Sequence, residues 1–426
     1  MNLLTWLHFP IFLLLIYLLW RSVQKGQGLV FWSALFFKLS CGLLLGWVYQ
    51  NYLNLGDTWT FHAQTQNVAE LAKQDAGKYL QFMFFNEIGN LPVYWKDYSN
   101  SFFFLKPLSL LYLLTNNSYW WSGLYLSLFS FWGAWFLVQQ IRRHFPAYGT
   151  SAFVVFLFFP SVVFWTSGVL KEPLFMGGLC LTVGMLLQLY KASGPSEATK
   201  KGILLLPCLY LIWRMKFFLA AILIVLMVPF LLTKWLARRF SLFRSGGSQY
   251  LAGAGLIVLG AFVGSFSHPA FDLDFFVNHL LYNYQVLTLR SDPANPLLHF
   301  PDLQPTLLSV LLHAPSAVVQ MLFRPFIWEP SSLVYKLMAV ENLFLFLLVL
   351  LTLIYLFRTR KVPALPSFLG VLLVFFFISA VLVTLPTPNL GSLHRYRAPL
   401  LPFFFLVVIA WGPIPTWLQM LSKQQN

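Results

Sequence analysis

Long apolar runs separated by short polar segments make up most of the chain. A helix needs about 20 apolar residues to cross the roughly 30 Å hydrocarbon core of a bilayer. Ten runs approach that length, and a shorter run at 203–213 must also cross if its neighbours do. The pattern predicts an all-α polytopic membrane protein with about eleven transmembrane helices. The predicted spans are 3–20, 28–49, 119–139, 151–168, 173–190, 203–213, 217–233, 249–266, 336–357, 364–385 and 398–413.

Two segments between spans are long, at 50–118 and 267–335. The first has a helical pattern that begins at Asn67 and an apolar stretch over 102–115. The second has an apolar part, 306–324, interrupted by polar residues and proline. These patterns predict interfacial or re-entrant helices in both long loops. We expect the 1–426 chain to form a single integral-membrane domain.

Composition supports a membrane protein. Hydrophobic residues make up 58% of the chain and charged residues only 10%, against about 25% charged in soluble domains. This excludes a disordered chain, and three cysteines in apolar runs exclude a disulfide-stapled fold. The net charge of +15 is expected from the positive-inside rule, so no nucleic-acid partner is needed to explain it.

Lysine and arginine also predict the orientation. Fifteen basic residues, from Arg21 to Lys423, fall in one set of short loops whose only acid is Glu197. Basic loops of this kind face the cytoplasm. The N-terminus is then outside, the C-terminus is cytoplasmic, and both long loops are outside. We therefore expect any chemistry to occur on the outer face.

The first candidate for chemistry is Asn54-Leu-Gly-Asp57-Thr-Trp-Thr-Phe-His62, directly after the second span. A carboxylate where a helix meets the membrane surface can be partly desolvated, which makes it more basic. It can also bind a divalent metal or a sugar hydroxyl. The alternative is that Asp57 belongs to a Gly-Asp turn.

The second candidate is the turn Phe159-Pro-Ser-Val-Val-Phe-Trp-Thr-Ser-Gly-Val-Leu-Lys171-Glu172-Pro. Charges in membrane-embedded sequence are costly and are functional hypotheses by default. Glu172 would lie near the positive N-terminal end of the next span. The alternative is a self-compensating interface anchor.

Cations also occur at two further outer positions. In Trp213-Arg-Met-Lys216, Arg214 offers a planar fork and Lys216 a point charge, a pair suited to a phosphate. The alternative for both is snorkelling to lipid headgroups. Before the last span, Asn389-Leu-Gly-Ser-Leu-His394-Arg395-Tyr396-Arg397 adds two more arginines. His394 can move protons, although a lone histidine is more often structural.

Arg324-Pro-Phe-Ile-Trp-Glu329 adds a cation, aromatic side chains and an acid. The sequence has no Gly-rich phosphate loop, no zinc-spaced Cys/His cluster and no serine nucleophile elbow. Only Lys38 places a charge near a span centre, which argues against an ion-coupled pump or channel.

The many spans, the aspartate that opens the first long outer loop and the cationic outer turns resemble the GT-C class of integral-membrane glycosyltransferases. The similarity is to bacterial enzymes that use polyprenyl-phosphate sugars to build cell-envelope polysaccharides. Phe-Pro-Ser-x-x-Phe-Trp-x-Ser-Gly-x-x-Lys-Glu at 159–172 and Gly-x-x-x-Arg-Tyr-Arg-x-Pro at 391–399 look like motifs of uncharacterised envelope proteins of this kind. The resemblance implies a bacterial inner-membrane location and a general base at Asp57.

The residues suit such chemistry. Transfer of a sugar from a lipid phosphate needs a carboxylate for the acceptor, cations for the leaving phosphate and an apolar groove for the lipid tail. Asp57 would supply the first, with Glu172 as the next candidate. The candidates for the second are Lys171, Arg214, Lys216, Arg395 and Arg397. The acceptor would be a glycan, a lipid or a protein.

Other functions stay open. A glycan polymerase or ligase also uses outer arginine and histidine residues, as in His394 to Arg397. A lipid or polysaccharide transporter would need a charged central cavity, and a structural assembly protein would have its outer charges scattered over the surface.

Overall fold

The computed structural model describes residues 3–418 apart from 54, 90, 96, 193, 267–271, 293–294 and 330–331. Lys423, one of the fifteen basic residues assigned to the cytoplasmic side, lies outside this range. Regular structure in the described residues is helical, apart from one isolated antiparallel bridge between Leu297 and Asn389. The all-α prediction is confirmed.

The chain divides into two compact units. Unit 1 comprises 1–139, 156–185 and 202–217, and unit 2 comprises 140–155, 186–201 and 218–426. Several helices contribute residues to both units.

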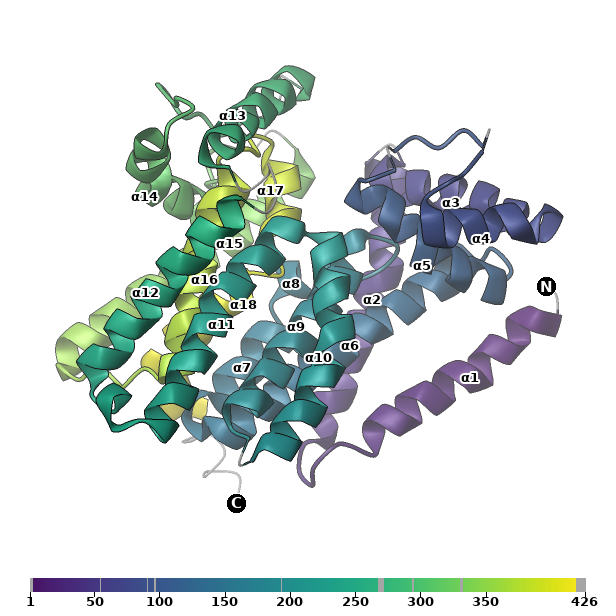
Figure 1. Cartoon of the computed structure of the whole chain (residues 1–426). Coiled ribbons are helices and arrows are strands. Elements are labelled where there is room, and N and C mark those ends of the chain that lie inside the picture. The colour runs from purple at the N-terminus through teal and green to yellow at the C-terminus, as the bar shows by residue number, and fades with distance from the viewer. Residues whose placement is uncertain are drawn as a thin grey trace. The chain divides into compact units, whose positions relative to one another are not determined.

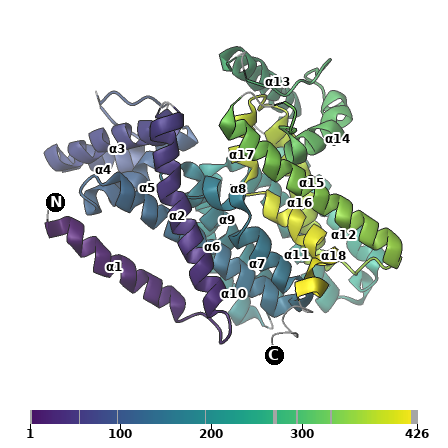
Figure 2. The same cartoon turned by 180° about the vertical axis from the view of Figure 1, so that it is seen from behind.

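Unit 1 holds the N-terminal helices and the first predicted outer loop. In Figures 1 and 2, α3, α4 and α5 lie together at one end of α2. The helices that lie wholly or largely in unit 1 are α1 (Leu3–Trp20), α2 (Gly28–Tyr52), α3 (Gly56–Gln74), α4 (Ala76–Phe85), α5 (Asn100–Leu114), α6 (Tyr119–His144), α8 (Pro160–Trp165), α9 (Lys171–Tyr190) and α10 (Pro195–Met215).

The helices of the first outer loop begin and end at residues suited to those positions. The Asp75 carboxylate accepts a hydrogen bond from the Lys78 amide at the start of α4, and Asn86 ends that helix in the left-handed region. Ser99 caps α5 by accepting from the Phe102 amide. The helix predicted at 102–115 is confirmed.

Glycine permits close packing between α6 and α9. A Cβ atom added to Gly133 would lie 2.3 Å from the carbonyl oxygen of Gly177. Small residues of this kind let the backbones of membrane helices approach each other. The two helices therefore form a tight pair inside unit 1.

Unit 2 holds the C-terminal half of the chain. In Figures 1 and 2, α13 and α14 lie at one end of the long helices α15 and α16. Its elements are η1 (Pro146–Tyr148), α7 (Gly149–Leu157), α11 (Phe217–Arg239), η2 (Ser241–Phe243), α12 (Gly246–Ser265), α13 (Leu273–Arg290), α14 (Leu307–Phe323), α15 (Leu333–Thr359), α16 (Ser367–Thr384), α17 (Leu390–Arg397) and α18 (Leu401–Trp411). Helix α14 packs against α13, α15, α16 and α17.

Seven helices of the described chain are long and apolar enough to cross a membrane, or eight if α17 and α18, bent by 66°, form one broken span. A multi-pass membrane protein is therefore supported, and eleven spans are not confirmed. The predicted span 151–168 is divided at Phe159 between α7 and α8. The run at 203–213 extends into a longer helix that also contains Glu197, Lys200 and Lys201.

Candidate functional site

Asp57 lies in the first turn of α3 and is exposed. The chain turns from α2 into α3 through Gly56, which has a φ of +42° and lies against the Tyr49 ring. A Cβ atom at this position would lie 2.7 Å from that ring, so the turn requires glycine. The sequence thus places the carboxylate at the positive end of a helix, on the surface of unit 1.

Thr58, the next residue, fixes the start of α3. Its hydroxyl donates to the carbonyl oxygen of Val169 at 2.8 Å and lies 2.6 Å from the Tyr119 hydroxyl. Trp59 stacks on the Tyr119 ring with centroids 4.3 Å apart, and its indole N–H donates to the Gly46 carbonyl. Asp57 is therefore held on a rigid helix start.

His62 lies half-buried one turn further along α3. Its Nδ1 is 2.7 Å from the Tyr112 hydroxyl of α5, and its ring meets Trp59 and Tyr119 edge to face. Burial lowers the pKa of His62 below its ordinary value of 6.5 and raises the pKa of Tyr112. At neutral pH, His62 is an uncharged imidazole beside a phenol that keeps its proton.

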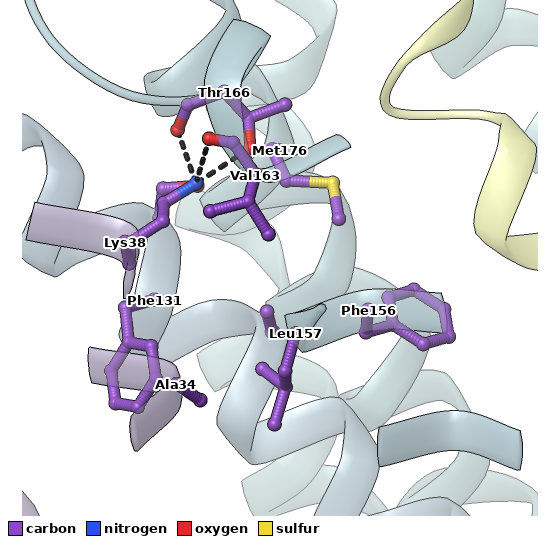
Figure 3. A pocket seen from close by; sticks show the side chains of 10 residues that line it. Ala34, Lys38, Phe131, Phe156, Leu157, Val163, Thr166 and Met176 are labelled. Atoms are coloured by element: carbon purple, nitrogen blue, oxygen red, sulfur yellow. Dashed lines mark hydrogen bonds between the residues drawn. The ribbon is translucent and has the colours of Figure 1, made fainter. Parts of the chain in front are cut away.

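The turn between α8 and α9 is buried, although the sequence predicts it at the outer ends of two spans. Lys38, near the middle of α2, donates to the Thr166 carbonyl at 2.5 Å, to the Thr166 hydroxyl at 2.6 Å and to the Val163 carbonyl at 3.5 Å. Figure 3 shows this ammonium group directed at the end of α8, beside a cavity of about 10 Å³. Lys38 therefore satisfies the last carbonyls of a helix, a role that lysine often takes.

Gly168 lets this turn approach α2. Its φ is +70°, and an added Cβ atom would lie 3.1 Å from the carbonyl oxygen of Gly42. The Gly168 amide donates to the Ser127 hydroxyl of α6 at 2.9 Å. The motif at 159–172 thus encodes a buried turn that delivers Lys171 and Glu172.

Lys171 and Glu172 begin α9 and occupy different environments. The Lys171 ammonium donates to the Asn100 amide oxygen at 3.0 Å and to the Ser101 hydroxyl at 2.9 Å, both on α5. Glu172 has no exposed surface and lies in the first turn of α9, where the helix dipole favours a carboxylate. Lys171 is directed at α5, and Glu172 is enclosed within unit 1.

Arg214 and Lys216 also contact different helices. The Arg214 guanidinium lies over the Phe103 ring of α5 at 4.9 Å. Lys216 is only 8% exposed, and its ammonium is 5.9 Å from the Phe175 ring of α9. Arg214 therefore joins Lys171 on α5, whereas Lys216 packs beside α9.

Lys106, on α5, is a cation that the sequence analysis missed. It donates to the Met83 carbonyl at 2.8 Å and to the Asn86 amide oxygen at 2.6 Å. Burial, with a smaller contribution from the charge of Arg214, lowers the pKa of Lys106. A lysine inside the apolar stretch 102–115 was the available signal.

Asn100, Phe103 and Lys106 lie at i, i+3 and i+6, a slanting stripe of α5 with about 4.5 Å of rise per step. Lys171 donates to Asn100, and Arg214 lies over the Phe103 ring. Lys106 is itself the third position of this row. We call these three cations the α5 cation stripe. Three separate segments of the chain thus bring positive charge to one helix, which also packs against α3.

In unit 2, Arg397 is fully buried. Its guanidinium donates to the carbonyl oxygens of Met321, Leu322 and Arg324 and to the amide oxygen of Asn342. This cation neutralises the C-terminal end of α14 and joins it to α15 and α17. The geometry is that of a structural clamp.

The other residues of α17 lie close to this clamp. Arg395 is 6% exposed, and its guanidinium lies 5.2 Å from the Tyr396 ring centroid. His394 is 2% exposed. Helix α17 therefore presents its charged side chains to the interior of unit 2.

Arg324 and Glu329 form an ion pair beside the end of α14. The Arg324 Nε lies 2.9 Å from one carboxylate oxygen of Glu329, and the Phe326 amide donates to the other at 3.0 Å. The two charged side chains of this predicted motif therefore pair with each other.

An apolar groove of about 580 Å³ lies in unit 2 between α13, α14 and α16. Phe276, Val310 and Ile378 are among its wholly apolar lining residues. No three His, Cys, Asp or Glu side chains gather as a metal site would require within the described part of the chain. The sequence prediction of a divalent metal at Asp57 gains no support from neighbouring ligands.

Of the twelve predicted site residues, six lie in unit 1 and six, including Tyr396, lie in unit 2. Comparisons with protein-family models, with curated proteins and with solved structures found no match.

Proposed function

We propose that this protein is a membrane glycosyltransferase that moves a sugar from a polyprenyl-phosphate donor to a glycan, lipid or protein acceptor on the outer face of the membrane. The observation that carries the proposal is the α5 cation stripe, which lies in the same unit as Asp57. Cations suited to a phosphate leaving group and a rigidly held carboxylate suited to an acceptor hydroxyl thus both belong to unit 1.

The proposed reaction breaks the bond between the anomeric carbon and the phosphate oxygen and forms a bond from that carbon to the acceptor oxygen. The acceptor proton passes to Asp57, which acts as general base. Negative charge grows on the phosphate as it leaves, and Lys171 and Arg214 stabilise it. Arg214 provides two parallel donors and Lys171 a compact charge.

Burial supports this division of roles. Arg214 and Lys171 retain partial exposure, whereas Lys106 is 7% exposed and holds the end of α4. Lys106 would therefore raise the local positive potential without contacting the donor. Arg397, as a clamp of α14, has a structural role in this proposal.

A polymerase or ligase is the second candidate. Arg395 and His394 adjoin one another in α17, and such a pair suits a lipid pyrophosphate. Incorporation of many sugars per acceptor, instead of one, would distinguish this activity from simple transfer.

The test uses the purified full chain in lipid nanodiscs, with radiolabelled polyprenyl-phosphate sugars and an envelope extract as acceptor. We expect labelled product from the wild type and at least tenfold less from Arg214→Gln and from Lys171→Gln, because each variant loses a charged hydrogen bond to the leaving group. Lys200→Gln, at an exposed cation in α10, is the matched control and should keep full activity.

Absence of any labelled product across the donors tested would refute the transferase proposal. Equal losses in the Lys200 control and the stripe variants would show a non-specific effect of positive charge and would remove the stripe from the site.

A further inference from the structure

Four aromatic rings meet where several helices of unit 2 begin or end. Phe368, in the first turn of α16, is 1% exposed and contacts the other three. Its ring centroid lies 6.5 Å from that of Phe145, 5.7 Å from that of Tyr190 and 6.1 Å from that of Phe230. We call Phe145, Tyr190, Phe230 and Phe368, all of unit 2, the aromatic platform.

Two lysines lie over rings of the aromatic platform. The Lys191 ammonium is 5.1 Å from the Tyr190 ring centroid and 5.5 Å from that of Phe145. The Lys234 ammonium is 5.8 Å from the ring centroid of Phe230. A cation within about 6 Å of a ring centroid is attracted to the face of that ring. The platform therefore holds both charges in place.

The cations of α11 also bind neighbouring segments. Arg238 donates to the carbonyl oxygens of Tyr190 at 3.0 Å and of Ala192 at 3.3 Å, which offsets the negative C-terminal end of α9. Lys234 donates to the amide oxygen of Gln249 at 2.7 Å. Arg238 and Lys234 thus have structural contacts as well as charge.

Arg143 and Lys191 carry charge that no acid offsets. Both are exposed, and neither forms an ion pair within the described residues. Glu197 is the only acid in the segments of unit 2 that precede residue 272, and it pairs with Lys201 at 2.5 Å. The platform therefore has an excess of positive charge around it.

These cations are also close to one another. Arg143, Lys191 and Lys201 all lie near enough to His144 for their charges to act on it. Like charges at short range repel, and the repulsion grows where the dielectric constant is low. An anion bound to Arg143 and Lys191 would remove that repulsion.

The aromatic platform lies at the ends of candidate membrane spans. Tyr190 ends α9, and Phe368 is near the start of α16. Trp235 of α11, a further candidate span, is 57% exposed, and tryptophan is enriched where a membrane meets water. Val228 and Leu232 of the same helix are exposed and apolar. These positions suit lipid headgroups at the platform and acyl chains along α11.

We propose that Arg143 and Lys191 bind the phosphate of an anionic phospholipid, with its acyl chains along the apolar surface of α11. Arginine offers a planar pair of donors and lysine a compact charge, the two kinds of donor that phosphates take. Basic pockets between membrane helices on the cytoplasmic side bind anionic headgroups, and the positive-inside rule assigns this end of the helices to the cytoplasm. This inference is independent of the proposed activity.

The experiment is a lipid titration of the purified, delipidated full chain in detergent, measured by native mass spectrometry. The probes are a phosphatidylglycerol and a phosphatidylcholine with the same acyl chains, and the readout is the affinity for the first lipid bound. We expect the wild type to prefer phosphatidylglycerol. Affinity for it should fall about fivefold for each cation removed, and so roughly 25-fold in Arg143→Gln/Lys191→Gln.

The matched control is Arg358→Gln/Lys361→Gln, which removes two exposed cations at the end of α15. It loses the same charge at another part of unit 2 and should keep the wild-type affinity. Lys191→Arg retains the charge over the platform and should also keep it. A loss in Lys191→Arg as large as in Arg143→Gln/Lys191→Gln would assign the effect to packing and overturn the proposal.

Three further outcomes would overturn it. The first is equal affinity of the wild type for the two lipids, or unchanged affinity in Arg143→Gln/Lys191→Gln. The second is an equal loss in the control, which would show a diffuse attraction to positive charge. The third is displacement of phosphatidylglycerol by millimolar inorganic phosphate, which would assign these cations to a soluble anion.

Discussion

At the scale of single residues, Asp57 and its neighbour Thr58 have separable roles. Thr58 anchors the helix start through two hydroxyl contacts, while Asp57 is exposed in the same turn. A residue that stabilises the fold and a residue available for chemistry therefore stand side by side. A substitution at Asp57 can therefore test activity while the contacts of Thr58 that hold the helix start remain.

We expect Asp57→Asn to lower sugar transfer by ~10²–10⁴-fold, the usual loss when a general base is removed. The unfolding free energy should fall by about 1 kcal/mol or less, since an exposed carboxylate at a helix N-terminus contributes little more. Transfer rates and thermal unfolding of the purified protein measure the two effects. A stable Asp57→Asn protein with near wild-type transfer would exclude Asp57 as the base and make Glu172 the next candidate.

His62 predicts how stability depends on pH. Burial depresses its pKa in the folded protein below 6.5, so between the two pKa values the unfolded chain binds more protons. Its contribution to stability is therefore complete above about pH 6.5 and is lost as pH falls below that value.

The melting temperature of the wild type should accordingly decrease from pH 7 to pH 5 more than that of His62→Gln, which cannot titrate. His279→Gln, at an exposed histidine of α13, is the control and should follow the wild type. Parallel curves for wild type and His62→Gln would show that this titration does not affect folding.

At the scale of elements, the buried turn between α8 and α9 is the feature that determines where Lys171 and Glu172 lie. Lys38 and Ser127 hold it from α2 and α6, two helices far away in the sequence. Gly168 adopts a backbone conformation that other residues rarely take. The turn is therefore sensitive to a single added methyl group.

Gly168→Ala should destabilise the protein by roughly 1–3 kcal/mol, because of the positive φ and the close approach to Gly42 and Leu45. Gly202→Ala is the matched control. It lies in α10 with open space around the added Cβ atom, so alanine should be neutral or stabilising by up to about 1 kcal/mol. Thermal unfolding in one detergent compares them, and equal melting temperatures would contradict the tight fit at Gly168.

Local sequence patterns predict individual helices but not the contacts between distant segments. The helices over 102–115 and 306–324 follow from local apolar patterns and are present as α5 and α14. The burial of the 159–172 turn depends on Lys38, which lies over 120 residues earlier, and no local pattern contains that contact. Arg397 was likewise predicted to bind a phosphate, because the sequence alone does not show that it donates to backbone carbonyls at the end of α14.

At the scale of the whole molecule, charge distribution and helix content lead to one testable topology. Fifteen basic residues and one acid fall in the loops assigned to the cytoplasm. The start of α10 belongs to these loops, and the end of α3 belongs to the first outer loop. Exposed positions exist in both, at Ser196 and Gln74.

A membrane-impermeant thiol reagent should therefore label Gln74→Cys in intact cells and leave Ser196→Cys unlabelled until the cells are lysed. Cys41 and Cys180 are buried and Cys208 is half-buried, so Cys208→Ala in both variants removes the one native thiol that a reagent could reach. Labelling of Ser196→Cys but not of Gln74→Cys in intact cells would reverse the positive-inside assignment. Asp57 and the α5 cation stripe would then face the cytoplasm, and outer-face transfer from a polyprenyl-phosphate sugar would have to be abandoned.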